Sequence, residues 1–244
     1  MRVWTIILCC IICIGCNNAS PEPGSTQPLV QNVLILTKTN GFRHTSIEAG
    51  TAMFLNNATA WNISPVVVTG TNAFVGNSLD AYDVIVLLNT TGDIFNAEEQ
   101  SVLQQFVRRG GGILAIHAAT DAEYDWPWYG QMLGAWFDNH PAIQLATCKV
   151  PVSSHPAVAN LPQLWQRTDE WYNFKQLQPD NHTLITVDES SYTGGTHGAS
   201  HPMSWYRYFD GGRVFYTAMG HTEEAYSEPL FKEHIKGALQ WLAQ

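Results

Sequence analysis

The sequence predicts an α/β domain with a mostly parallel central sheet. Short apolar runs at residues 32–37, 65–69, 83–88 and 113–116 are each bounded by polar or glycine residues, which is typical of strands covered on both faces. Segments with helical character lie between these runs. Strands that alternate with helices form parallel sheets through right-handed crossovers. Since the sequence shows no internal repeat, we expect a single domain.

Helices are expected between the strands and at the carboxyl end of the chain. The first covers residues 45–57. The second begins at Asn96, a favourable N-cap, and ends at Arg109; acidic residues in its first turn and arginines in its last turn match the helix dipole. A final strand at residues 213–217 leads into an amphipathic helix over residues 229–242.

The amino-terminal segment predicts export. Residues 1–16 combine Arg2, an apolar stretch and a small residue before Cys16, the layout of a bacterial lipoprotein signal peptide. We expect Cys16 to carry a lipid that anchors the protein in a membrane, in the periplasm or at the cell surface. A signal peptide of another kind, or an uncleaved anchor, is the alternative. Residues 17–30 are polar and proline-rich, which favours a flexible linker to a domain over residues 31–244.

Composition excludes several classes of function. The formal net charge is -9 and basic residues form no run, which argues against nucleic-acid binding. The glycine run at residues 110–112 precedes a strand and does not open a helix, so it is not in the context of a phosphate loop. Cys148 stands alone in the domain, so no disulfide can form within it, and stability must come from the core or from a metal.

The ends of the predicted strands select the candidate site. Ligands of parallel sheets bind outside the carboxyl ends of the strands, which points to residues 40–44, 89–93 and 117–121. His117 follows the fourth apolar run directly. Near neutral pH, histidine is a good general base or metal ligand, although a histidine that only hydrogen-bonds at the strand end would fit the same pattern.

Further histidines follow other strands. His44 lies after the first run and His221 after the last, so both can converge with His117. His140 is a weaker candidate, because a His-Pro pair also serves as a rigid turn. Neutral imidazoles with a carboxylate favour Zn²⁺ or a similar divalent ion. We therefore predict a metal held by some members of one set of histidines: His44, His117, His140 and His221.

Two clusters combine carboxylates with aromatic rings. One follows His117, and the other contains Glu170, which could complete the metal site or transfer a proton. The aromatic rings could stack on a sugar, or could instead pack in the core. The candidates for substrate binding in these clusters are Asp121, Tyr124, Trp126, Trp171 and Tyr172.

As a set, these motifs resemble the ThuA-like, or trehalose-utilisation, family over residues 32–244. The matching stretches are Gly41-Phe42-Arg43-His44 and residues 109–120, 124–130, 139–141, 169–172 and 211–224. The resemblance implies a class I glutamine amidotransferase-like, flavodoxin-like fold, a three-layer sandwich around the sheet. It also adds Arg43 to the expected substrate-binding residues.

The resemblance further implies a site without the usual nucleophile. Members of that superfamily typically carry a cysteine where this sequence has His117, which argues against glutamine amidotransferase chemistry. His221 and Glu224 fall where the partner histidine and acid are expected. Family membership implies a role in carbohydrate metabolism, often alongside sugar oxidoreductases, with a sugar or 3-keto-glycoside as substrate.

Two hypotheses about function follow. In the first, the protein is a metal-assisted hydrolase, lyase or isomerase, with His117 as ligand or base and Glu170 or Glu224 as the proton-transfer group. In the second, it is a non-catalytic carbohydrate-binding lipoprotein whose aromatic residues dock glycans and whose histidines only orient them. Covalent hydrolysis by Thr120 or Ser46 is disfavoured, because neither has an evident activating partner in the sequence.

Overall fold

The four apolar runs form neighbouring parallel strands. The computed structural model describes Met1 and residues 31–244, and the strands within it that correspond to the runs are β1 (Gln31–Leu36), β2 (Ile63–Val68), β3 (Val84–Leu88) and β4 (Gly112–Ile116). They lie in the order β2-β1-β3-β4, and β11 (Gly212–Thr217) continues the parallel arrangement beside β4. All five residues of β3 and of β4 are buried, as strands covered on both faces must be. The predicted fold class is confirmed.

Beyond β11 the sheet continues with antiparallel strands that the sequence analysis did not predict. They are β10 (His201–Phe209), β9 (His182–Val187), β6 (Gln144–Lys149) and β7 (Leu164–Asp169). The full order of the nine-stranded sheet is β2-β1-β3-β4-β11-β10-β9-β6-β7. A separate antiparallel pair joins β5 (Trp136–Asn139) to β8 (Asn173–Lys175). The molecule therefore has a parallel half and an antiparallel half within one sheet.

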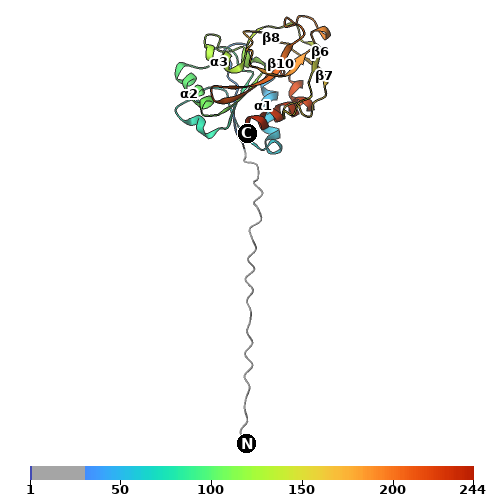
Figure 1. The fold of residues 1–244 in the computed structure, drawn as a ribbon. Coiled ribbons are helices and arrows are strands. Elements are labelled where there is room, and N and C mark those ends of the chain that lie inside the picture. Colours follow the sequence, from blue (N-terminus) through green and yellow to red (C-terminus); the bar gives the residue numbers. More distant parts are fainter. Residues whose placement is uncertain (2–30) are drawn as a thin grey trace.

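Helices cover both faces of the sheet. They are α1 (Ile47–Trp61), α2 (Ala97–Arg108), α3 (Pro127–Leu133) and α4 (Pro229–Leu242). Figure 1 shows α2 and α3 on one side of the sheet and α1 with the carboxyl-terminal helix on the other, so the domain has three layers. The predicted cap of α2 is present, because the Asn96 side chain accepts from the backbone N–H groups of Glu98 and Glu99. The first helix ends four residues later than expected, where left-handed Asn62 closes it.

The amino ends and the carboxyl ends of the parallel strands lie at opposite edges of the sheet. The chain enters β1 at Gln31, which pairs with Ile63 at the amino end of β2. The segments that follow β1, β3, β4 and β11 lie at the opposite edge, where the candidate residues are found. The predicted signal peptide with Cys16 and the predicted linker lie outside the described residues, Met1 apart. Within the described part of the chain, no helix has the length and apolar character needed to cross a membrane.

Candidate metal centre

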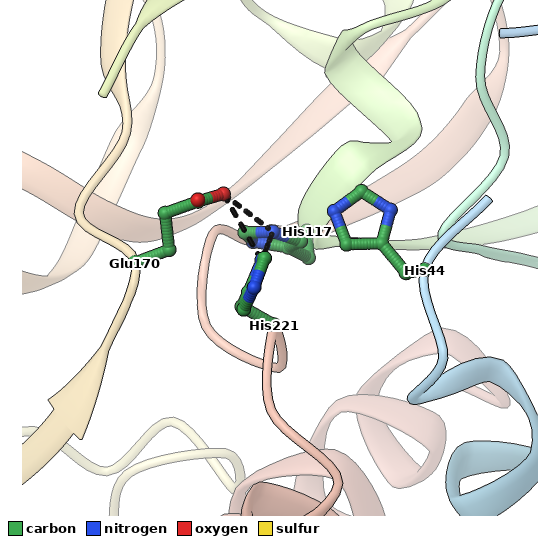
Figure 2. Close-up of side chains that lie close together, drawn as sticks. All are labelled: His44, His117, Glu170 and His221. Atoms are coloured by element: carbon green, nitrogen blue, oxygen red, sulfur yellow. Dashed lines mark hydrogen bonds and ion pairs between the residues drawn. The ribbon is translucent and has the colours of Figure 1, made fainter. Parts of the chain in front are cut away.

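Four side chains converge beyond the carboxyl ends of the strands, as Figure 2 shows. His44 follows β1, His117 follows β4, His221 follows β11 and Glu170 follows β7. One potential ligand atom of each lies within 4.8 Å of those of the other three. His44, His117 and Glu170 are buried and His221 is partly buried. Residues far apart in the sequence thus form one donor set of three imidazoles and a carboxylate.

His117 sits on a sharp turn between β4 and a short 3₁₀ helix, η2 (His117–Thr120). Its φ of 47° lies in the left-handed region, which non-glycine residues seldom occupy and which often marks a functional position. The ring Nδ1 lies 2.6 Å from the carbonyl oxygen of Ala218 and therefore donates its hydrogen there. The other nitrogen, Nε2, faces the cluster, as in many metal-binding histidines.

The loop that carries His221 is held by a buried carboxylate. Asp169, at the end of β7, accepts the backbone N–H groups of Gly220 at 3.0 Å and His221 at 3.1 Å. The guanidinium of Arg167 lies 3.0 Å from the same carboxylate, so the buried charge is paired. This arrangement places His221 Nδ1 3.1 Å from Nε2 of His117.

Glu170 connects the cluster to its surroundings. Its Oε2 lies 3.4 Å from His117 Nε2 and 3.0 Å from His221 Nδ1, while Oε1 lies 3.0 Å from Nδ1 of His140. Burial alone would raise the pKa of Glu170, but hydrogen bonds from His117 and His221 hold that pKa well below its usual value. Burial opposes protonation of His221, yet the Glu170 carboxylate raises the pKa of this imidazole. Glu170 is therefore ionised and can serve as an anionic ligand.

The surroundings of His44 bear on whether a metal ion fits the cluster. Burial, reinforced by the neighbouring His117 and His221, lowers its pKa to about 3, so the ring is neutral. Its Nδ1 is buried and has no hydrogen-bond partner among the described residues. Figure 2 shows this Nδ1 on the far side of the ring and the other nitrogen, Nε2, turned towards His117, so Nε2 is the atom that can serve as a ligand. The donor set, three imidazoles and an ionised carboxylate, fits Zn²⁺ or a similar divalent ion.

Three further side chains lie around the cluster. The His140 side chain is 42% exposed and lies on the outer side of Glu170, and it is not one of the four converging side chains. Asp121 is half-buried and accepts the Tyr124 hydroxyl hydrogen at 2.7 Å; burial raises the pKa of this carboxyl. Tyr172 is buried, and its ring packs against His117 with centroids 4.2 Å apart.

Other candidate residues lie away from the cluster. Glu224 is exposed at the start of the 3₁₀ helix η4 (Glu224–Ser227) and lines a different pocket, beside Gln166 and Thr168. Trp171 is fully buried, and its Nε1 donates to the carbonyl oxygen of Gln144 at 2.9 Å, so it acts in the core.

Two more candidates make contacts of their own. Trp126 is half-buried and stacks on Trp128 with ring centroids 5.1 Å apart. Arg43 is exposed and forms an ion pair with Glu48. The structure therefore brings neither of them to the four converging side chains.

Sequence reasoning missed residues that hold or flank the cluster. Phe42 is 67% exposed and its ring packs edge-on against His44, with centroids 4.9 Å apart. Asn89 lies in a loop that the strand-end rule selected, but nothing in its type singled it out. Asp169 stands next to Glu170, yet a buried carboxylate that binds only backbone and one arginine has no sequence signature.

Comparison with known proteins agrees with this architecture. A family model described as ThuA, trehalose utilisation, matches residues 32–242. No curated protein matches the sequence significantly. A putative ThuA-like protein from Bacteroides uniformis is 21% identical with a TM-score of 0.75, over 91% of this chain and 95% of that one. Another from Parabacteroides merdae is 18% identical with a TM-score of 0.74, over 88% of this chain and 90% of that one.

A β-galactosidase from Rahnella sp. R3 shares the fold more distantly. It is 13% identical with a TM-score of 0.56, and the match covers 87% of this chain but 31% of that enzyme. Likeness at such low identity concerns the fold alone. The family model, in contrast, spans nearly the whole described domain, and it shows that this chain belongs to the ThuA, or trehalose-utilisation, family.

Proposed function

We propose that this protein is a metal-dependent enzyme that acts on a sugar or a 3-keto-glycoside. The observation that carries the proposal is the convergence of potential ligand atoms of His44, His117, His221 and Glu170 within 4.8 Å of one another. A divalent ion bound there would polarise a carbonyl or hydroxyl oxygen of the substrate, or activate water. The family's description, trehalose utilisation, supports a carbohydrate as the substrate class.

The proton-transfer group in this proposal is His140. Its Nδ1 lies 3.0 Å from Glu170 Oε1 and 2.9 Å from the carbonyl oxygen of Pro141, so Nδ1 carries the hydrogen and Nε2 is the basic nitrogen. The ionised Glu170 orients this ring, as a buried carboxylate does for a catalytic histidine. In a keto-glycoside, His140 would remove the proton next to the ketone, which leads to elimination or isomerisation.

Asp121 is a second group near the cluster that can carry a proton. Burial raises the pKa of this carboxyl despite the hydrogen bond from Tyr124, which suits a group that returns a proton to a leaving oxygen. This division of labour replaces the role we had considered for Glu224, whose side chain faces another pocket. The aromatic rings of Phe42 and Tyr124, both exposed, are the surfaces on which a sugar ring would stack.

We also propose that the protein works outside the cytoplasm, anchored by a lipid on Cys16, and that a sugar oxidoreductase supplies its oxidised substrate. Mass spectrometry of the membrane fraction tests the anchor, because a diacylglyceryl group on Cys16 has a defined mass. Membrane association that persists after Cys16→Ser substitution, or wild-type protein without this mass, would contradict it.

Metal content is the direct test of the proposed centre. Untagged protein, dialysed and analysed for metals, should contain about one equivalent of a divalent ion. His117→Ala and His44→Ala should lose it, whereas His182→Ala, a change at an exposed histidine that stacks on Tyr206, should retain it. A metal-free wild type, or unchanged content in His117→Ala, contradicts the proposal.

Turnover separates an enzyme from a binding protein. Metal-loaded protein should convert a 3-keto-glycoside over a long incubation, chelation should stop the reaction, and the restored ion should revive it. Calorimetry with native and oxidised sugars provides the comparison. Binding of these sugars without any product would instead favour the non-catalytic carbohydrate-binding alternative.

A further inference from the structure

Asn89 lies between the histidine-bearing segments without being one of the converging side chains. It follows β3 directly and is completely buried. Its φ of 49° lies in the left-handed region, which asparagine tolerates better than most residues. A buried polar side chain at this position has to find hydrogen-bond partners, and those partners show what it does.

The side-chain amide of Asn89 contacts the segments of two histidines. Its Nδ2 lies 3.0 Å from the hydroxyl oxygen of Ser46, two residues after His44. The same nitrogen lies 3.3 Å from the Tyr226 hydroxyl and 3.5 Å from the carbonyl oxygen of Gly220, which immediately precedes His221. The amide therefore ties the loop after β1 to the loop after β11.

The backbone of Asn89 reaches the third histidine segment. Its N–H donates to the carbonyl oxygen of Ile116 at 3.3 Å, and Ile116 immediately precedes His117. One buried residue thus contacts the segments that carry all three imidazoles of the cluster. The fourth side chain, Glu170, is positioned separately, next to the Asp169 carboxylate that holds the His221 loop.

Close packing fixes the shape of this group. The Tyr226 hydroxyl donates to the Gly220 carbonyl at 2.9 Å, and the Ser46 hydroxyl reaches the same oxygen at 3.4 Å. Gly220 has a φ of 110°, and a Cβ there would lie 2.9 Å from the Tyr226 hydroxyl oxygen. We call Ser46, Asn89, Gly220 and Tyr226 the Asn89 network. Because all four are buried and mutually bonded, a change in one shifts the others.

We propose that Asn89 is a positioning residue that sets the spacing of His44, His117 and His221, and thereby the affinity and coordination geometry of the metal centre. This inference rests on the proposed metal site. The competing explanation is that asparagine is present only because it accepts a left-handed backbone. Substitution of Asn89 by glycine distinguishes these two explanations, because glycine keeps the backbone conformation and the backbone N–H but removes the side-chain amide.

The experiment compares Asn89→Gly with a matched control. Asn62 also has a left-handed φ, of 56°, but it lies between α1 and β2 at the amino edge, so Asn62→Gly repeats the backbone change away from the cluster. Zn²⁺ affinity is measured by competition with a chromogenic chelator. The visible absorption of bound Co²⁺ reports ligand number and geometry. Thermal unfolding of the metal-free proteins reports the fold.

We expect Asn89→Gly to bind Zn²⁺ about 10–100-fold more weakly than wild type, as is typical when a partner of the ligands is lost, and to show an altered Co²⁺ spectrum. Asn62→Gly should match wild type in both. A folded Asn89→Gly with wild-type affinity and an unchanged Co²⁺ spectrum overturns the role of Asn89 alone.

A second variant keeps the inference testable if Asn89→Gly fails to fold. Tyr226→Phe removes the hydroxyl that lies between Asn89 and Gly220, and we expect a smaller loss of affinity in the same direction. Unchanged affinity and an unchanged Co²⁺ spectrum in folded Tyr226→Phe would then overturn the inference. A wild type that binds neither ion overturns the proposed function, and this inference with it.

Discussion

The parallel and antiparallel halves of the sheet make different contributions to the cluster. The parallel half supplies the three imidazoles, each from a segment after a parallel strand. The antiparallel half supplies the carboxylate, Glu170, directly after β7, and β5 of the separate antiparallel pair is followed directly by His140. The imidazoles and the carboxylate of the cluster thus come from separate regions.

The two halves therefore differ in what they contribute to metal binding and to the proposed reaction. Parallel strands have their carboxyl ends at one edge, so ligands there follow from the topology alone. The antiparallel strands extend the same sheet, and β7 brings Glu170 to His117, His221 and His140. We therefore expect substitutions in the parallel half to change metal binding, and substitutions in the added half to change reactivity as well.

The largest effect is expected at Glu170, where the two halves meet. Glu170→Gln removes the negative charge from the ligand set and the anionic partner of His140. Metal affinity should fall by more than about 100-fold, beyond the usual loss for an indirect partner, and turnover should disappear. Chelator competition and product assays measure the two effects. Glu224→Gln is the matched control, and a similar loss there would contradict the assignment.

Next in size is the effect at His140, which follows β5 of the separate antiparallel pair. His140→Gln should lower the turnover rate about 10²–10⁴-fold, the usual range for a lost general base, while the metal content stays at the wild-type level. Steady-state kinetics with elemental analysis of the same samples checks this. Loss of the metal in this variant would instead make His140 a ligand and remove the contrast between the halves.

Asp169 tests how firmly the antiparallel half holds the His221 loop. Asp169→Asn leaves the buried Arg167 without its full counter-charge and weakens the acceptors for two backbone N–H groups. Loss of one partner from a buried ion pair costs about 3–5 kcal/mol of folding free energy. We expect a value at the lower end of this range, because Glu228 lies 3.4 Å from Arg167 and remains as a counter-charge. Urea unfolding measures this free energy, and a change below about 1 kcal/mol would show that the pair is dispensable.

A smaller effect concerns acid stability at the junction of the halves. His234, on α4, is buried against Ser204 on β10, and burial lowers its pKa to about 4. The unfolded chain takes up this proton near pH 6.5 and the folded one does not, so stability falls as the pH drops from about 6.5 to about 4, by at most about 3 kcal/mol. The free energy of unfolding of wild type and of His234→Gln, measured at pH 7 and at pH 4.5, gives the contribution of His234 to this loss. An equal loss in both proteins would assign the acid sensitivity elsewhere.

The parallel half was largely predictable because its signals are local. Strands buried on both faces read as unbroken apolar runs, and those runs located β1, β2, β3 and β4 to within two residues at either end. The position of His117 followed from the same pattern. The convergence of His44 and His221 with it needed only the rule that parallel strands end at one edge.

The antiparallel half was not predictable because its pattern contradicts simple hydropathy. In β7 the alternate buried residues include Arg167 and Asp169, while Leu164 is 65% exposed. The two buried charges satisfy each other, which the sequence does not reveal. The role of Asn89 was hidden for a related reason, since it depends on partners from segments far away in the chain.

The direction of β1 also fixes where the chain enters the domain relative to the four converging side chains. Gln31 begins this strand at one edge of the sheet, and the His44 segment leaves from the other, about 20 Å away over six residues. The segment before Gln31 therefore joins the domain at the pole opposite the metal centre. A lipid on Cys16, as proposed above, would therefore attach to the domain on the side away from the four converging side chains.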